Sequence, residues 1–169
     1  FKAMVSHLLE RTDCNGRIGT VGMCLGGHLA LRCAFEEQVI AAVCLFATDI
    51  HTGSLGSNGD DTLARIKTHL AAPTEVTMIF GKQDNHVPVQ GRRAIHDAME
   101  EGAVDFQWVE LNAQHAFIRD EKSKGRYDPA LTAICNQLMF EVFRRRLTFG
   151  APSAASVQPQ KQAAGPASC

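Results

Sequence analysis

The residues with the clearest chemical potential lie in the segment Gly22-Met23-Cys24-Leu25-Gly26-Gly27, which follows an apolar stretch and opens a helical pattern. This G-x-C-x-G sequence is the thiol form of the nucleophile elbow, in which a strand turns sharply into a helix. Glycine is expected two positions before and after Cys24, because side chains there would clash. The dipole at a helix N-terminus favours a thiolate, and the next backbone N–H, from Leu25, points at a developing oxyanion. The segment predicts a nucleophilic cysteine; the alternative is a glycine-rich turn with a structural cysteine.

Two later loops carry the other residue types that such a nucleophile needs. Asp84 lies in the loop of residues 81–88 after one predicted strand, and His115 follows the next predicted strand. The order of nucleophile, acid and histidine, each just past a strand, is that of α/β-hydrolase triads. In this interpretation Asp84 orients His115, and His115 takes the proton of Cys24. Taken singly, an Asp in a loop or a His after a strand is more often a surface or core residue.

Other polar residues near these loops have weaker claims. His28 lies one turn into the predicted elbow helix, where packing or surface exposure is the commoner role. His86 is only two residues from Asp84, too close to act as the triad histidine, but it is a candidate to line the pocket. Asp49 and His51 follow a neighbouring strand at the same sheet edge and are candidates for the same role. The remaining charged groups are expected to be solvated surface: Asp105, Glu110 and the arginine run 144–146.

The elements that must position these residues alternate along the chain, after an amphipathic helical pattern over residues 1–12. Strands are expected over residues 17–21, 39–46, 76–80 and 106–111. Further helices are expected over residues 26–35, 61–70, 89–101 and 129–147. This alternation predicts an α/β fold with three α/β/α layers around a parallel sheet of about four strands. Functional residues are then expected in loops at the carboxyl ends of the strands.

Composition and charge restrict the class of protein. Of the 169 residues, 45% are hydrophobic and 21% charged, values typical of a globular domain. The formal net charge is −1, so no basic field favours nucleic acid or an anionic membrane as a partner. No apolar run approaches the roughly 18 residues of a membrane helix, and no signal-peptide pattern opens the sequence. We expect one domain over residues 1–150 and a disordered Ala/Ser/Pro/Gln-rich tail over 151–169.

The cysteine pattern does not indicate a metal site. The six cysteines stand at positions 14, 24, 33, 44, 135 and 169, and none of their spacings gives the close pairs of a zinc or thioredoxin motif. We therefore predict no metal and no cofactor. Without a secretory signal, we expect reduced thiols and a cytoplasmic location. A redox sensor built on Cys24 is a weaker alternative, because it needs a nearby resolving cysteine. Cys33, nine residues on, is expected to face the core.

Three segments together resemble the dienelactone hydrolase family, a cysteine branch of the α/β hydrolases. They are residues 22–27, the loop Gly81-x-x-Asp84-x-His86-Val87-Pro88 and His115-Ala116-Phe117. The resemblance extends over about residues 10–147. It implies a hydrolase of lactone or ester bonds, similar to carboxymethylenebutenolidase, with a triad of Cys24, Asp84 and His115.

The same resemblance implies a small-molecule substrate that bears a carboxylate. Family members hold that carboxylate with arginines, one of them four residues past the catalytic histidine, where this sequence has Arg119. Arginine can grip a carboxylate through two parallel hydrogen bonds. The alternative is a surface arginine that pairs with Asp120 or Glu121.

The sequence departs from the family before the elbow. In an α/β hydrolase the elbow follows the fifth strand of an eight-stranded sheet, whereas here about 16 residues precede the strand expected at 17–21. The resemblance thus implies a partial fold that lacks the N-terminal strands. A second oxyanion N–H, a glutamate beside the resting thiol and a further substrate arginine would belong to the upstream half.

An open strand edge is the expected consequence. Strand 17–21 would lie at that edge, and exposed edges favour pairing with another chain. We therefore expect self-association through this edge. The alternative to an active hydrolase is a truncated, inactive fragment or a half-domain that depends on a partner.

Overall fold

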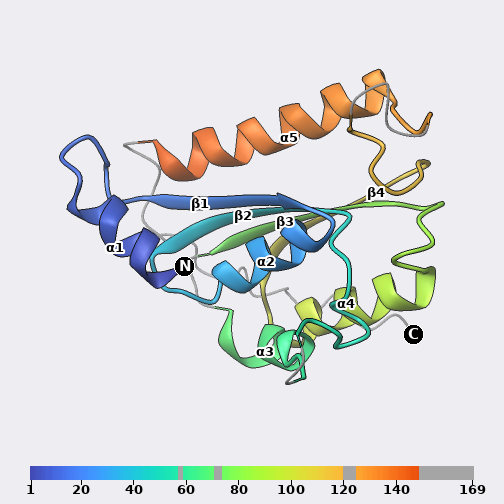
Figure 1. The fold of residues 1–169 in the computed structure, drawn as a ribbon, viewed down its shortest axis with the longest axis horizontal. Helices are drawn as coiled ribbons and strands as arrows, with labels where there is room; N and C mark the ends of the chain where they lie inside the picture. The colour runs from blue at the N-terminus through green and yellow to red at the C-terminus, as the bar shows by residue number, and fades with distance from the viewer. Residues whose placement is uncertain (57–58, 71–73, 120–124, 149–169) are drawn as a thin grey trace, which may run out of the picture.

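Four stretches of apolar and β-branched residues form the central parallel sheet of the molecule (Figure 1). The computed structural model describes residues 1–56, 59–70, 74–119 and 125–148. Within them the strands are β1 (Ile18–Met23), β2 (Val39–Leu45), β3 (Glu75–Gly81) and β4 (Asp105–Leu111). The helices are α1 (Lys2–Glu10), α2 (Leu25–Cys33), α3 (Thr62–His69), α4 (Val89–Glu101) and α5 (Pro129–Leu147).

The expected elements are all present, and their ends differ from the sequence prediction by at most two residues. The N-terminal signal of α5 is a clear case. Asp128 accepts a hydrogen bond from the Leu131 N–H at 2.9 Å and Pro129 is the first helical residue, as the Asp-Pro pair predicts.

Within the described residues no helix has both the length and the apolar character to cross a membrane. The tail expected over 151–169 lies outside the described residues, so the domain boundary stays a prediction.

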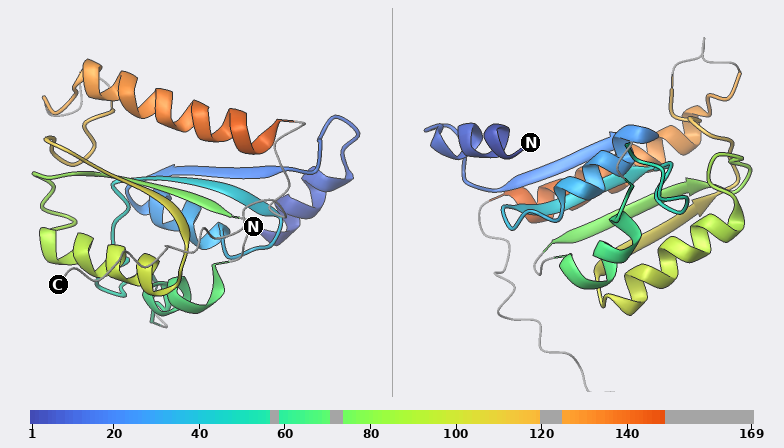
Figure 2. Two further views of the ribbon diagram at one scale, coloured as in Figure 1. Left: turned by 180° about the vertical axis from the view of Figure 1, so that it is seen from behind. Right: turned by 60° about the horizontal axis from the view of Figure 1, so that its bottom comes forward.

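The strand order explains the layers. The strands follow one another as β1-β2-β3-β4, all parallel, so each crossover moves to the next strand in the same direction. Right-handed crossovers then place α2, α3 and α4 on the same face. Figures 1 and 2 show these three helices there, with α5 across the opposite face. The predicted α/β/α architecture is confirmed.

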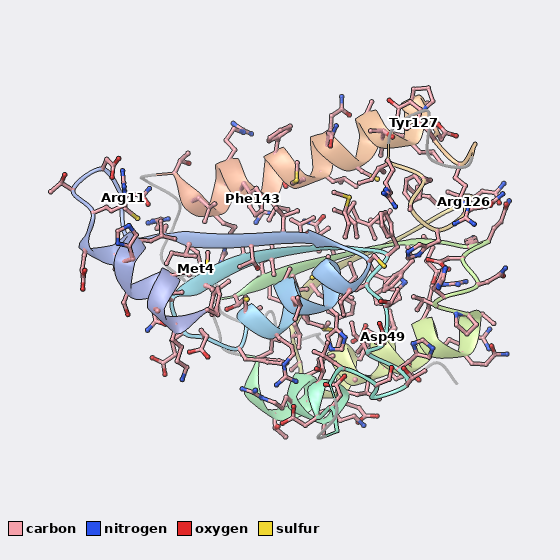
Figure 3. All side chains as sticks on the ribbon, in the orientation of Figure 1. Met4, Arg11, Asp49, Arg126, Tyr127 and Phe143 are labelled. Carbon is pink, nitrogen blue, oxygen red and sulfur yellow. The ribbon has the colours of Figure 1, made fainter. Side chains whose placement is uncertain are left out.

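The two inner strands carry the core. Every residue of β3 is buried, and so is all of β2 except Ile40. Successive side chains alternate between the faces: Ala42 and Cys44 join the cluster under α2 and α4, whereas Val43 and Leu45 join the cluster under α5. Figure 3 shows Phe143 of α5 directed towards the sheet, where it packs against the second cluster.

Some charges expected to be solvated surface are instead engaged in ion pairs. Glu75 is buried at the start of β3 and receives two hydrogen bonds from Arg145, at 2.5 and 2.6 Å, which join α5 to the sheet. Glu110 accepts from Arg92 at 3.1 Å and from the Trp108 ring at 3.2 Å. The sequence could not indicate these pairs, because each joins residues whose proximity depends on packing or strand register.

The free side of β1 carries exposed apolar residues. Among the described strands β1 is paired with β2 only, and α1 buries Val5 alone beside it. We call the exposed large hydrophobic residues of this region the β1 apolar surface: Phe1, Met4, Leu8, Leu9, Val21, Met23, Leu25 and Leu29. Part of this surface lines a cavity between α1, β1 and α2. The open strand edge expected from the sequence is thus accompanied by an apolar flank.

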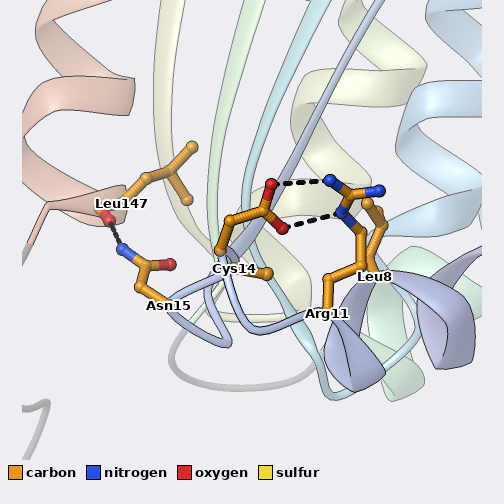
Figure 4. A pocket seen from close by; sticks show the side chains of 6 residues that line it. Leu8, Arg11, Cys14, Asn15 and Leu147 are labelled. Carbon is orange, nitrogen blue, oxygen red and sulfur yellow. Dashed lines mark hydrogen bonds and ion pairs between the residues drawn. The ribbon is translucent and has the colours of Figure 1, made fainter.

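A second hollow lies at the amino end of β1, away from the elbow cysteine (Figure 4). Asn15 donates a side-chain hydrogen bond to the Leu147 carbonyl at 2.7 Å, which ties the loop before β1 to the end of α5. The ion pair of Arg11 and Asp13 beside it is exposed, and exposed pairs contribute little to stability. The contacts of this hollow support the fold, and its lining includes none of the predicted catalytic residues.

Candidate active site

The backbone around Cys24 forms a sharp strand-to-helix turn. Cys24 has φ of 57° and ψ of −126°, a strained conformation for a residue other than glycine. Its N–H donates to the Leu45 carbonyl at 3.0 Å, and its own carbonyl accepts from the Thr48 N–H at 3.3 Å. These two bonds tie the elbow to the end of β2. Cys24 itself is half-buried and packs against the cluster under α5.

The glycines around the cysteine have different reasons for being small. A Cβ at Gly22 would lie 1.9 Å from the Gly26 carbonyl oxygen, so the turn requires glycine there. A Cβ at Gly26 would meet nothing within 4 Å, which corrects the expectation of a clash at that position. The reason is that Gly26 lines the cavity beside the β1 apolar surface. The close approach lies one residue later, where a Cβ on Gly27 would be 3.0 Å from the Leu45 carbonyl oxygen.

Asp84 and His115 meet at the carboxyl ends of β3 and β4. His115 Nδ1 lies 2.7 Å from Asp84 Oδ2, and both side chains are buried. The other carboxylate oxygen of Asp84 accepts from the His86 N–H at 2.8 Å. Burial alone raises the pKa of Asp84, but the hydrogen bonds from His115 and the His86 N–H bring it below its usual value. Asp84 is therefore ionised near neutral pH and holds the ring of His115 in one orientation.

The ring of His115 is enclosed by two aromatic groups. The Phe46 ring packs edge-on with centroids 5.0 Å apart, and the His86 ring lies tilted at 4.3 Å. His86, expected to line a pocket, is exposed next to the ring. Phe46 follows β2 with a positive φ of 40° and is fully buried. The imidazole is thus confined by packing on its flanks as well as by the carboxylate of Asp84.

The thiol of Cys24 faces the loop after β2. Its Sγ lies 4.0 Å from Thr48 Oγ1, and the Thr48 hydroxyl donates to Asp49 Oδ2 at 2.6 Å. Between the described side chains of Cys24 and His115 there is no hydrogen bond. Of the predicted triad, Asp84 and His115 are therefore joined by a hydrogen bond, whereas the sulfur of Cys24 lies next to the Thr48 hydroxyl. Sequence reasoning missed Thr48, although its place directly after β2 was a signal for this edge of the sheet.

The other candidate residues from the sequence differ in their burial and contacts. Leu25 begins α2, so its N–H is one of the free donors of the helix terminus. Arg119 is exposed, and its rival partners at 120 and 121 lie outside the described residues. His51 is half-buried, and its ring would lie within 2.6 Å of a Cβ on Gly91. His28 is fully buried and bonds Thr62 at 2.8 Å, a packing role as expected.

The described cysteines are free thiols, and no candidate metal centre appears in the parts of the chain that the structure describes. Cys24 and Cys33 lie at opposite ends of α2, about 13 Å apart at the rise of an α-helix. A disulfide needs Cα atoms within about 7 Å. Cys33, the resolving cysteine considered for the redox-sensor alternative, is therefore too far from Cys24.

Comparison with known proteins gives the family context. The family model for the dienelactone hydrolase family matches residues 1–147. A Saccharomyces cerevisiae protein, provisionally named a carboxymethylenebutenolidase, is 48% identical over 133 residues, which are 78% of this chain and 49% of that protein. A carboxymethylenebutenolidase from a Pseudomonas species is 27% identical over 150 residues, 88% of this chain and 56% of its own.

A solved structure supports the fold. A provisionally assigned dienelactone hydrolase from Klebsiella pneumoniae superposes with a TM-score of 0.73 at 20% identity, over 85% of this chain and 58% of that one. The chain thus spans about half the length of the curated relatives that it matches.

Proposed function

The chain belongs to the dienelactone hydrolase family, and we propose that it hydrolyses a lactone or ester bond with Cys24 as nucleophile, His115 as proton carrier and Asp84 as orienting carboxylate. The buried hydrogen bond between His115 and Asp84, at the same sheet edge as the elbow cysteine, is the observation that carries this proposal. In a triad the base is held in its productive orientation by a third group. Asp84 is suited to that task because its lowered pKa keeps it ionised.

The proposed reaction has two steps. The sulfur of Cys24 leaves Thr48 by rotation about the Cα–Cβ bond, gives its proton to His115 and attacks the acyl carbon. The Leu25 N–H stabilises the oxyanion that forms. The C–O bond breaks as His115 returns the proton to the leaving oxygen. Water, activated by His115, then hydrolyses the thioester and restores the thiol.

The substrate is proposed to be a small lactone or ester that carries a carboxylate. Arg119 follows His115 by four residues and is exposed, so its guanidinium is available for bidentate binding. His86, exposed beside His115, is the second proposed contact with substrate. The cytoplasmic location stays a prediction.

A partner-dependent half-domain is the second candidate, and the β1 apolar surface favours it. Of the exposed large hydrophobic residues in the described ranges, most belong to this surface, and it flanks the free edge of β1. Exposed apolar patches beside open edges mark interaction sites. A strand added at this edge, from a second copy or from another chain, would bring new backbone next to the elbow.

The test is hydrolysis of an activated ester and of a dienelactone by the purified chain. Changing Cys24→Ala or His115→Ala is expected to lower the rate by about 10³-fold or more. The matched control is Cys14→Ala, which removes a thiol at the other end of β1 and is expected to leave the rate unchanged. Equal rates for Cys24→Ala and the unmodified chain would refute the proposed nucleophile. An unmodified chain with no hydrolysis would favour the half-domain.

A further inference from the structure

The segment of residues 82–88, which joins β3 to α4, is held to the end of β4 at its beginning. The Lys82 N–H donates a hydrogen bond to the Leu111 carbonyl at 2.7 Å. The Gln83 N–H then donates to the Ala113 carbonyl at 2.9 Å. These two main-chain bonds extend the pairing of β3 with β4 into the segment, so its first residues are fixed to the neighbouring strand.

The end of the same segment is held by the side chain of Arg92. Arg92 lies in the first turn of α4, and its guanidinium turns back to donate a hydrogen bond from Nη1 to the Val87 carbonyl at 2.9 Å. Arg92 is 4% exposed and Val87 is fully buried. A buried carbonyl needs a donor, and here the donor is a charged group, which forms the stronger kind of hydrogen bond.

A second bond fixes the direction of the guanidinium. Its Nε donates to Glu110 Oε1 at 3.1 Å, and the ring N–H of Trp108 donates to the same oxygen at 3.2 Å. Burial alone raises the pKa of Glu110, but the hydrogen bonds from Trp108 and Arg92 bring it below its usual value. An ionised carboxylate near the end of β4 therefore holds one edge of the planar guanidinium, while another edge reaches Val87.

The residues between these two attachments include the acid of the proposed triad. The Asp84 carboxylate lies 2.7 Å from His115, and its other oxygen accepts from the His86 N–H at 2.8 Å. His86 directly precedes Val87, so a movement of the Val87 carbonyl would carry the His86 N–H away from the carboxylate. We propose that Arg92 is a positioning residue, which through the Val87 carbonyl keeps the Asp84 carboxylate directed at the proton carrier. This inference rests on the proposed function, in which His115 is that carrier.

The expected effect on the reaction follows from where Arg92 lies. Its guanidinium is buried against Glu110 and Val87, so it acts through the segment and does not touch the substrate. A misplacement of about 1 Å in a catalytic arrangement can cost about 10²-fold in rate. Loss of the guanidinium should therefore lower kcat and leave KM unchanged.

The first experiment follows the Nδ1 proton of His115 by NMR spectroscopy and measures its exchange with water. The proton is assigned by its absence in His115→Ala. Arg92→Met is expected to make the exchange about tenfold faster, because the segment then lacks a hydrogen bond from a charged group. Unchanged exchange in Arg92→Met would overturn the proposal. A proton too labile to observe in the unmodified chain would overturn it as well, because the imidazole would then not be held by Asp84.

The matched control is Arg145→Met. Arg145 also donates to a glutamate, Glu75, but it lies on α5 and its partner lies at the amino end of β3, away from the loops after β3 and β4. Both variants are expected to lower the unfolding midpoint in urea, whereas only Arg92→Met should speed the exchange of the His115 proton. Equal acceleration in the two variants would indicate a general loss of stability and refute the positioning role.

A second variant, Arg92→Lys, separates the shape of the guanidinium from its charge. Lysine keeps the positive charge but lacks the planar group that reaches Glu110 and Val87 in two fixed directions. Faster exchange of the His115 proton is therefore expected here as well. Exchange as slow as in the unmodified chain would show that charge alone is sufficient and would refute the role of the guanidinium. Because Glu110 keeps a cationic partner in this variant, the test remains decisive where Arg92→Met does not fold.

The exchange measurement does not require turnover, so it can be separated from the proposed function. Faster exchange in Arg92→Met, in a chain without hydrolytic activity, would support the role of Arg92 and contradict the proposed activity of this chain. Ester hydrolysis that depends on Cys24, together with exchange and kcat that are unchanged in Arg92→Met, would support the nucleophile and overturn the role of Arg92.

Discussion

Replacing Gly22 and Gly26 separately with alanine tests the geometry of the elbow, because the two glycines flank Cys24 symmetrically in sequence but not in space. A Cβ at Gly22 would lie 1.9 Å from the oxygen and 2.3 Å from the carbon of the Gly26 carbonyl. Both atoms belong to the backbone of the first turn of α2, so no side-chain rotation relieves the contact. At Gly26 the added methyl group would enter open space.

The two substitutions should change stability in opposite directions. Overpacking of a tight site costs about 1–3 kcal/mol and sometimes more, and a clash with backbone alone places Gly22→Ala at or above about 3 kcal/mol. Gly26→Ala removes a glycine from a helix, which stabilises by roughly 0.5–1 kcal/mol. With a urea m-value of about 2 kcal/mol/M, the unfolding midpoint should fall by about 1.5 M in the first variant and rise by up to about 0.5 M in the second.

Urea titration followed by far-ultraviolet circular dichroism measures both midpoints on the same protein. Hydrolytic activity is not needed, so the result bears on the turn itself. A fall in midpoint for Gly26→Ala as large as that for Gly22→Ala would refute the reasoning, because it would mean that both glycines are in contact. A Gly22→Ala variant with an unchanged midpoint would show that the turn between β1 and α2 is not as tight as described.

Two further predictions concern acid stability and the strand edge. The pKa of Asp84 is lower in the folded chain than in the unfolded chain, so the stability that its carboxylate contributes is present above the unfolded pKa and is lost as the pH falls through the folded pKa. Urea titrations should therefore show that Asp84→Asn loses less stability between pH 5 and pH 3 than the unmodified chain does. Equal losses in the two proteins would contradict the role given to this carboxylate. Self-association through β1 should appear as a dimer in light scattering. Val21→Lys places a charge at the exposed edge and should convert this dimer to a monomer. An unmodified chain that is monomeric at high concentration would exclude self-association through β1.

The sequence predicted the elements closely because local signals and burial agree in this chain. The apolar run of β2 is buried in the structure, and the Asp128-Pro129 pair begins α5 where it was expected. The proximity of Asp84 and His115 was also predictable, since parallel strands bring the loops after β3 and β4 to one edge. That logic needs only strand order and direction, which the alternation of strands and helices indicates.

Other parts of the site depend on distances that no local pattern contains. The contact between Cys24 and Thr48 results from two backbone hydrogen bonds between the elbow and the end of β2. The open space beside Gly26 depends on what lies across from α2, and the G-x-C-x-G pattern carries no information about that. The ion pair of Arg145 with Glu75 joins residues 70 positions apart, so an arginine run that resembles a solvated face is partly committed to the sheet.

The residues of the proposed triad follow strands at different places in the sheet. Asp84 and His115 follow β3 and β4, where the Asp84 carboxylate is buried and the imidazole is enclosed by Phe46. Cys24 follows β1, which lies at the opposite edge of the described sheet from β4, and Leu25 beside it is 46% exposed. A partner on the β1 apolar surface would therefore change the surroundings of the sulfur and of the oxyanion N–H, and would leave the acid–base pair as it is. In the proposed mechanism, a partner that supplied one further oxyanion donor at this edge would raise the Cys24-dependent rate by about 10²–10³.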